Sequence, residues 1–218
     1  NSGLSRINVK IKALEESEIN GQGPAILPEE IDMLLQKLDQ LEDGDILVLA
    51  GAIPASLPED MYERIMKRLQ KKKIEIVVDA TKDLLRNVLK YHPFLIKPNN
   101  HELGEMFGVT LTTDEEIITY AKKLQELGAR NVLISMAKDG AILITEQEDV
   151  KRIGVPKGTV KNSVGAGDSM VAGFVASYSR DHDYQKALVY GTATGSATAF
   201  SEGLATKDVV DELLKQLV

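Results

Sequence analysis

Four short apolar runs constrain the fold of this chain more than any other feature of its sequence. They lie at residues 46–50, 74–78, 94–96 and 132–134, and between them apolar residues recur at helical spacing. Strands that are apolar along most of their length are buried on both faces, as in a parallel sheet between two layers of helices. We therefore predict an α/β fold with a mostly parallel central sheet and helices on both of its faces.

Helix signals and a second strand pattern extend this expectation. Pro28 and Pro58 stand where two helices should begin, and Thr113 with Glu116 forms a capping box at the start of another. Further helices are expected at residues 84–89, 166–179, 184–200 and 206–217. Residues 141–144 and 150–155 favour antiparallel strands.

The N-terminal segment has a different pattern. Ile7, Val9, Ile11 and Ala13 alternate with polar residues, which predicts a strand with one solvent-facing side. We expect residues 1–24 to form part of a β lid and its return to the core. Residues 25–218 are then expected to form the α/β core.

The composition excludes several classes of function. The 218 residues carry 26 Lys+Arg against 33 Asp+Glu, a net charge of −7, which argues against binding nucleic acid by neutralising phosphates. Without cysteine the chain has no disulfide, no thiolate catalysis and no thiolate-bound metal. No apolar run approaches the roughly 18 residues of a membrane span, and no signal-peptide pattern opens the sequence. We expect a cytoplasmic protein with no membrane partner.

The densest candidate for chemistry is the small-residue loop at 162–168, directly before an apolar helix. Backbone N–H groups of Gly165, Ala166 and Gly167, together with the positive end of the helix dipole, can bind an anion there. Asp168 follows in the first helical turn. The alternative is a tight glycine turn in which Asp168 only complements the dipole.

Several segments together resemble a known family. Residues 94–102 (FLIKPNNHE), 135–141 (SMAKDGA) and 164–174 (VGAGDSMVAGF) resemble, in this order along the chain, signature segments of the ribokinase-like sugar kinases of the phosphofructokinase B type. Residues 5–10 and 49–54 also align with family segments near the sugar phosphate. The resemblance covers essentially the whole chain and is strongest to the branch that phosphorylates fructose 1-phosphate.

The resemblance implies an ATP-dependent kinase that converts fructose 1-phosphate into fructose 1,6-bisphosphate. Asp168 is then the base for the sugar hydroxyl, and Gly165, Ala166 and Gly167 stabilise the charge on the transferred phosphoryl group. Two alternatives stay open. One is a family member that acts on tagatose 6-phosphate or another sugar, and the other is a nucleotide-binding fragment without catalysis.

The remaining site residues also come from the resemblance. Asn99 and Glu102 would organise Mg²⁺, Glu102 through water, although the same pair suits an ordinary helix cap. Arg6, Lys10 and Gly51 are expected near the sugar phosphate, although Arg6 and Lys10 also suit a solvent-exposed strand. The residues expected to bind the nucleotide are Lys97, Asn99, Ser135, Gly140, Gly195 and Ser196.

The sequence departs from the family at identifiable points. Ala52 and Ala137 stand where Ser and Gly are common. Asn162 replaces the commoner Asp ahead of the glycine loop, by which we mean Gly165, Ala166 and Gly167, and this replacement weakens the case for the monovalent-cation site that the resemblance implies. No Gly-Gly-x-Gly-x-Asn sugar-binding motif occurs in the sequence, so we expect the chain to be the C-terminal portion of such a kinase. A homodimer paired through the lid strands is a further expectation.

Overall fold

The structure is a computed structural model that describes residues 3–12 and 16–218. It forms two compact units. The first contains the described residues up to Asp45 together with Gly51–Ile74, and the second contains Ile46–Ala50 and Glu75–Val218. The expected boundary between residues 24 and 25 stays a prediction.

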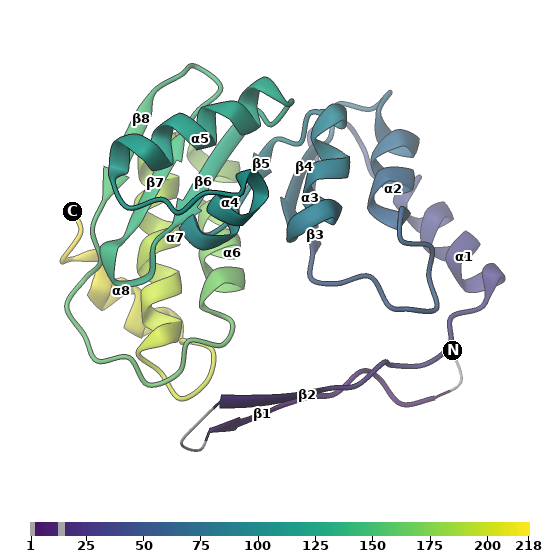
Figure 1. Ribbon diagram of the computed structural model, residues 1–218, viewed down its shortest axis with the longest axis horizontal. Coiled ribbons are helices and arrows are strands. Elements are labelled where there is room, and N and C mark those ends of the chain that lie inside the picture. Colours follow the sequence, from purple (N-terminus) through teal and green to yellow (C-terminus); the bar gives the residue numbers. More distant parts are fainter. Residues whose placement is uncertain (1–2, 13–15) are drawn as a thin grey trace. The chain divides into compact units, whose positions relative to one another are not determined.

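The second unit is built on a six-stranded sheet in the order β3-β4-β5-β6-β7-β8 (Figure 1). The first three pairings are parallel and the last two antiparallel, which confirms the predicted mostly parallel sheet. The strands are β3 (Ile46–Ala50), β4 (Glu75–Asp79), β5 (Leu95–Ile96), β6 (Asn131–Ser135), β7 (Ala141–Ile144) and β8 (Val150–Ile153).

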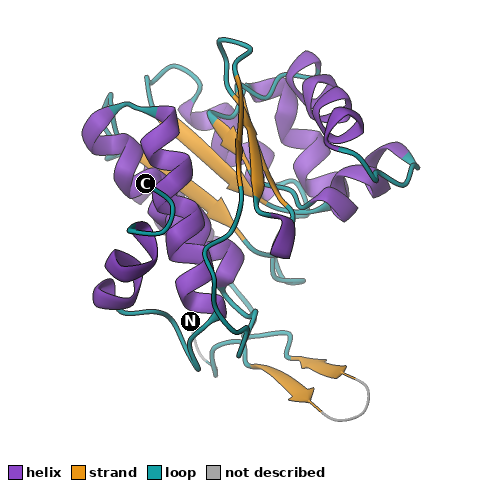
Figure 2. Cartoon of the chain, turned by 90° about the vertical axis from the view of Figure 1, so that its left-hand side faces the viewer, coloured by secondary structure: helices purple, strands orange, loops and turns teal. Residues whose placement is uncertain are grey.

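Both faces of this sheet are covered by helices, as Figure 2 shows. Val77, Leu95 and Leu133 pack in one cluster with α6 and α7, while the alternate residues Val132 and Ile134 are equally buried. On the other face α5 contacts β6 and β7. The helices of this unit are α3 (Lys82–Val88), α4 (Asn100–Phe107), α5 (Asp114–Glu126), α6 (Ala166–Asp181), α7 (Tyr184–Ala199) and α8 (Lys207–Leu214), with short 3₁₀ turns at Leu89–Tyr91 and Ala137–Asp139.

Helices α6 and α7 approach each other closely through glycines. A Cβ on Gly173 would lie 2.5 Å from Thr194 Oγ1, and one on Gly191 would lie 2.8 Å from the carbonyl oxygen of Met170. Neither distance is sterically allowed, so Gly191 lets the two backbones meet directly, and Gly173 makes room for the Thr194 side chain. The start of α6, which carries the glycine loop, is therefore held in place by α7.

The first unit contains a two-stranded antiparallel sheet, β1 (Asn8–Lys12) with β2 (Glu16–Asn20), and the helices α1 (Pro28–Leu38) and α2 (Met61–Leu69). Strand β1 agrees with the predicted alternation, except that Ala13 lies outside the described residues. Helix α2 begins three residues after Pro58. Arg68 of α2 pairs with Asp39 through two hydrogen bonds, of 2.5 and 2.6 Å, which ties α2 to the end of α1.

No helix in the part of the chain that the structure describes is long and apolar enough to cross a membrane.

Gly140, which connects β6 to β7, tests the fold directly. It has φ +89°, and a Cβ there would lie 2.0 Å from the carbonyl oxygen of Ile153. We predict that Gly140→Ala lowers the free energy of unfolding by more than about 2 kcal/mol, from backbone strain and the clash with β8. Urea unfolding measures this value.

The matched control is Gly154→Ala, because a Cβ at Gly154 meets nothing within 4 Å. It should stay within about 0.5 kcal/mol of the parent. Equal stability of the two variants would contradict the tight approach of β8 to Gly140.

Candidate active site

The candidate site is built at the edge of the sheet where the parallel strands end. Asp79 is the last residue of β4, Lys97 follows β5, and Ser135 ends β6. Because these strands are parallel and adjacent, their carboxyl ends share one edge. Ligands of open α/β sheets bind at such an edge.

Lys97 and Asp79 form a buried ion pair. The Lys97 Nζ lies 3.3 Å from Asp79 Oδ1, and the lysine is only 7% exposed. Burial raises the pKa of Asp79, and the neighbouring Lys97 ammonium opposes that rise. Without Asp79 the Lys97 ammonium would be a buried, uncompensated charge. Asp79 therefore stabilises this cation at the carboxyl ends of the strands.

The glycine loop lies directly against this lysine. Lys97 Nζ is 3.2 Å from the position that a Cβ of Gly167 would occupy. Gly165, with φ +79°, is the N-cap of α6, so the helix begins at the loop as predicted. A positive charge, a helix N-terminus and a glycine backbone therefore meet at one point, an arrangement suited to phosphate.

One of the three backbone amides predicted to bind an anion is already used by a hydrogen bond within the loop. The N–H of Ala166 donates to the carbonyl oxygen of Ser163 at 3.2 Å, and the first helical bond runs from Ser169 N to Gly165 O. Among the described residues, the amides of Gly165 and Gly167 have no acceptor. The structure therefore leaves these two donors available, and that of Ala166 is used within the loop.

Asp168 is an exposed carboxylate in the first turn of α6. It is near the ion pair, because its charge, like that of Glu102, helps to raise the pKa of Asp79, after the larger effects of burial and of Lys97. One cation and three carboxylates thus gather at this edge.

Asn99 and Glu102 form a reciprocal capping box at the start of α4. Glu102 N donates to Asn99 Oδ1 at 2.8 Å, and Asn99 N donates to Glu102 Oε2 at 2.8 Å. One carboxylate oxygen, Oε1, makes no hydrogen bond within the described residues. No group of three or more metal-ligating side chains occurs in residues 3–12 and 16–218. The donors fit Mg²⁺ held mainly by water and phosphate, because this ion commonly uses few carboxylates.

Ser135 and Gly140 flank the turn after β6. Ser135 N donates to the carbonyl oxygen of Pro98 at 3.2 Å, which places Ser135 beside Asn99. Gly140 is needed for the approach of β8. Between them, Ala137 has φ +46° at the position where the family commonly has glycine. At position 137 the turn therefore keeps a glycine-like backbone conformation with an alanine.

Gly195 and Ser196 are buried in α7 behind the glycine loop. A Cβ on Gly195 would lie 3.0 Å from the carbonyl oxygen of Ala166. Ser196 is only 9% exposed. Both residues thus lie at the base of the loop, and Gly195 allows α7 to approach it.

The residues expected at the sugar phosphate belong to the first unit. Arg6 Nε donates to Asn8 Oδ1 at 3.0 Å, and Gly51 O accepts from the Tyr62 hydroxyl at 3.1 Å. Lys10 is paired in register with Glu18, and its side chain lies outside the described residues. The structure gathers the nucleotide-side and catalytic candidates in one unit and these three in the other.

Comparison with known proteins identifies the family. The model of the pfkB family carbohydrate kinases matches residues 4–210. The chain belongs to this family. It is 49% identical to a protein named 1-phosphofructokinase from Bacillus subtilis, over 99% of this chain and 71% of that protein. It is 37% identical to a D-tagatose-1-phosphate kinase from Bacillus licheniformis, over 99% and 71%.

The fold agrees with this assignment. A ribokinase from Arabidopsis thaliana superposes with a TM-score of 0.77 at 21% identity, covering 99% of this chain and 70% of that one. The predicted ribokinase-like fold is therefore confirmed. This pfkB kinase is a phosphotransferase, as the motifs predicted, and a kinase of this family uses ATP.

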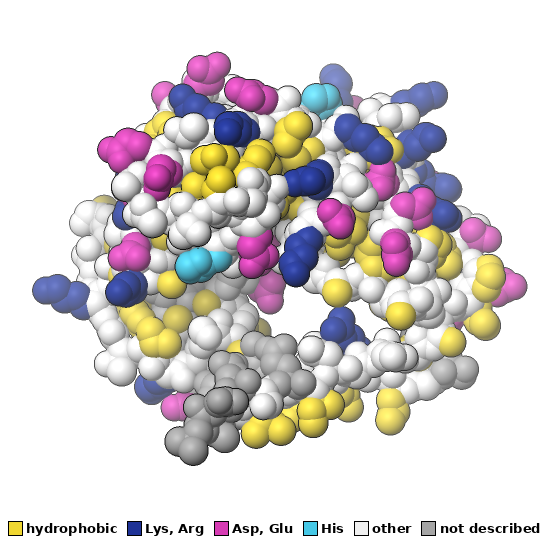
Figure 3. Space-filling model, viewed as in Figure 1, with side chains coloured by type: hydrophobic (Ala, Val, Ile, Leu, Met, Phe, Trp, Pro, Cys, Tyr) yellow, Lys and Arg dark blue, Asp and Glu magenta, His cyan; other side chains and the backbone are white. Residues whose placement is uncertain are grey.

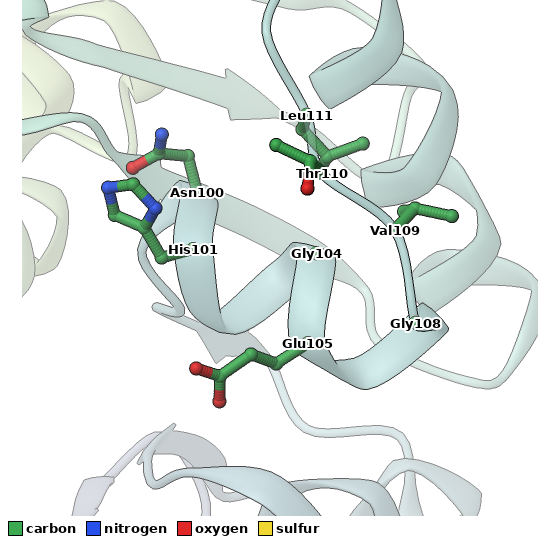
Figure 4. Close-up of a pocket in the computed structure, with 8 residues that line it drawn as sticks. All are labelled: Asn100, His101, Gly104, Glu105, Gly108, Val109, Thr110 and Leu111. Atoms are coloured by element: carbon green, nitrogen blue, oxygen red, sulfur yellow. The ribbon is translucent and has the colours of Figure 1, made fainter.

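A cavity of about 380 Å³ lies on another side of α4. Figure 4 shows Asn100 and His101 projecting from the start of the helix and the segment Val109–Thr110–Leu111 passing beside it. Neither Asn99 nor Glu102 lines this cavity. The candidate site of this pfkB kinase is thus the open strand edge, and the cavity is separate.

Two contacts of the site escaped prediction. The first is the ion pair of Asp79 with Lys97, because nothing in the neighbours of Asp79 along the chain indicates Lys97 as its partner. The Asn162 side chain was noted as a departure from the family, but its contacts across the fold were not predicted. The one available signal for the Asp79–Lys97 pair is the presence of a polar residue at the end of a buried strand.

The Lys97–Asp79 pair predicts non-additive stability changes in this pfkB kinase. Lys97→Met alone leaves Asp79 buried without a partner and should lower the free energy of unfolding by about 3 kcal/mol. Replacing both residues, Lys97→Met with Asp79→Leu, should restore most of that loss, because an apolar pair needs no compensating charge. Denaturant unfolding of the parent, Lys97→Met, Asp79→Leu and the double variant gives the coupling free energy of the pair.

Lys207→Met, at an exposed i,i+4 pair with Asp211, is the control and should change the stability by less than about 1 kcal/mol. Strictly additive losses at positions 79 and 97 would contradict the pair.

Proposed function

We propose that this chain transfers the γ-phosphoryl group of ATP to the 6-hydroxyl of fructose 1-phosphate and so forms fructose 1,6-bisphosphate. The observation that carries the proposal is the meeting of Lys97, the Gly167 backbone and Asp168 at the start of α6. The 49% identity to a protein named 1-phosphofructokinase supports the acceptor.

Asp168 takes the role of base. The hydroxyl oxygen of the sugar attacks the γ-phosphorus, the bond from that phosphorus to the β–γ bridging oxygen breaks, and the electron pair leaves with ADP. The hydroxyl proton passes to the Asp168 carboxylate, which is exposed to the incoming substrate. Its place in the first turn of α6 brings the base within reach of the loop that holds the phosphoryl group.

The loop and Lys97 stabilise the negative charge on the transferred group. The amides of Gly165 and Gly167 are fixed by the start of α6, so their dipoles need not reorient during the reaction. Lys97 adds a full positive charge next to Gly167. Its pairing with Asp79 orients the ammonium before ATP binds.

Asn99 and Glu102 are proposed to hold Mg²⁺ through water. When bound, this ion neutralises charge on the ATP phosphates. The capping box fixes the Glu102 carboxylate through Oε2 and leaves Oε1 to accept from a water molecule. Ser135, Gly140, Gly195 and Ser196 are proposed to line the nucleotide side, with Gly195 acting through the backbone approach of α7 to the loop.

The first unit is proposed to bind the sugar phosphate. Arg6 is the favoured phosphate ligand, because its planar guanidinium can form two parallel hydrogen bonds. The Arg6 Nε contact with Asn8 holds the side chain at the start of β1. Lys10 and Gly51 complete this proposed subsite, where Ala52 offers no hydroxyl. Residues 1–24 are proposed to form the lid, and 25–218 the core.

The hairpin also supports a proposed homodimer. Val9 and Ile19 are paired in register, and with Ile7 and Ile11 they leave an exposed apolar side. Figure 3 shows hydrophobic side chains gathered along this segment. A second copy of the hairpin is the proposed partner, and the cytoplasm, which supplies ATP, is the proposed location.

A second candidate acceptor is tagatose 1-phosphate. It is favoured by the 37% identity to a D-tagatose-1-phosphate kinase. The two sugar phosphates differ in the configuration at one carbon, so a pocket that binds one needs little change to bind the other.

The experiment measures ADP release with ATP·Mg²⁺ and four acceptors: fructose 1-phosphate, tagatose 1-phosphate, tagatose 6-phosphate and fructose 6-phosphate. We expect the highest kcat/KM with fructose 1-phosphate. Preference for tagatose 1-phosphate would transfer the assignment to the second candidate. ATP binding without turnover on any acceptor would indicate the non-catalytic alternative.

Asp168→Asn should lower kcat by about 10²- to 10⁴-fold, because the amide cannot accept the proton. Asp208→Asn is the matched control, since Asp208 also lies in the first turn of a helix, α8, and is exposed. It should leave kcat unchanged. Near-normal turnover of Asp168→Asn would show that Asp168 only complements the helix dipole.

A further inference from the structure

The side chain of Asn162 bridges two loops next to the start of α6. Its Oδ1 accepts from the N–H of Val164 at 3.2 Å, and its Nδ2 donates to the carbonyl oxygen of Glu202 at 3.3 Å. Val164 directly precedes the glycine loop, and Glu202 lies between α7 and α8. One amide side chain therefore connects the glycine loop to a segment about 40 residues away.

The backbone around Asn162 is fixed on the same side. The N–H groups of Lys161 and Asn162 both donate to the carbonyl oxygen of Ala199, at 2.8 and 3.1 Å. Thr198 donates to Ser169 Oγ at 2.9 Å and so ties the end of α7 to the first turns of α6. Helix α7 thus supports the glycine loop, and Asn162 fixes the segment that leads into the loop.

The two contacts of Asn162 require an amide. An amide has one accepting and one donating edge, whereas a carboxylate only accepts. Turning the amide over would place Nδ2 against the Val164 N–H and Oδ1 against the Glu202 oxygen, so both contacts agree on one orientation. An aspartate here would place a carboxylate oxygen against the carbonyl oxygen of Glu202. A cation between these two oxygens would be needed to offset their repulsion.

The donor set therefore does not fit a monovalent cation on the Asn162 side chain. The edge that faces the Glu202 carbonyl already carries the hydrogens of Nδ2. We propose that Asn162 is a positioning residue for the glycine loop, which replaces a carboxylate–cation bridge with a neutral amide, so that loop order and turnover do not depend on K⁺. The expected independence of turnover from K⁺ rests on the proposed function, whereas the expected independence of loop order from K⁺ does not.

The test compares the parent with Asn162→Asp in two salts, KCl at about 100 mM and tetramethylammonium chloride at the same ionic strength. Equal ionic strength keeps the screening of charges the same in both salts. The first readout is hydrogen exchange of residues 158–168, which needs no turnover. In the parent it should be the same in both salts. In Asn162→Asp it should be at least about tenfold faster without K⁺ and should slow again when K⁺ is added.

The second readout is kinetic. Parent kcat and KM for ATP should differ by less than about twofold between the salts, while Asn162→Asp should show a raised KM for ATP that K⁺ lowers. Asn87→Asp, which adds the same charge at an exposed position on α3, should behave as the parent. Asn162→Ala should loosen the loop in both salts, because it offers no ligand to a cation.

Three results would overturn the proposal. The first is hydrogen exchange of the parent's loop that depends on K⁺. The second is an Asn162→Asp variant whose loop exchanges at the parent's rate in both salts. The third is an Asn162→Asp variant whose loop exchanges faster than the parent's and is not slowed by K⁺. The parent measurement stands even where a variant fails to fold. A chain that turns over no sugar phosphate would refute the proposed function and leave the exchange result valid.

Discussion

The site depends on one buried ion pair. Lys97 is almost completely buried, and Asp79 alone lies within ion-pair distance of its ammonium among the described residues. Removing either charge leaves the other in a position where water cannot compensate it. The pair also explains the glycine at 167, since Lys97 Nζ occupies the space next to a Cβ there. The proposed phosphate site therefore combines the strand ends, the loop and the helix dipole with a cation that the sheet itself positions.

The second constraint is the close contact of α6 with α7. Gly173, Gly191 and Gly195 bring the two backbones together, and Gly195 does so at the carbonyl of Ala166 inside the loop. A loop that must present fixed amides to a developing charge gains from such rigid support, because its dipoles are oriented in advance. The fold thus connects helix packing in the core to the candidate site at the edge of the sheet.

Periodicity predicted the elements that burial dictates. The apolar runs became β3 to β6, and the capping box at Thr113 starts α5 as expected. Strand β2, with the sequence ESEIN, was missed because its polar residues carry no strand signal without their partner. Likewise, the bridge from Asn162 to Glu202 depends on a tertiary contact, which the local sequence does not encode. The bond from the Ala166 amide to Ser163 is local, but it depends on the exact turn conformation of the loop, which the residue pattern does not specify.

The most direct test of this account is calorimetric titration with ATP·Mg²⁺ of the chain that carries both Asp79→Leu and Lys97→Met. This variant removes the cation and its partner together and avoids an unpaired buried charge. The account predicts that the affinity for ATP falls at least about tenfold, or about 1.4 kcal/mol, while the exposed-lysine variant Lys207→Met binds as the parent does. Parent-like affinity in the double variant would contradict the claim that the buried pair builds the phosphate site.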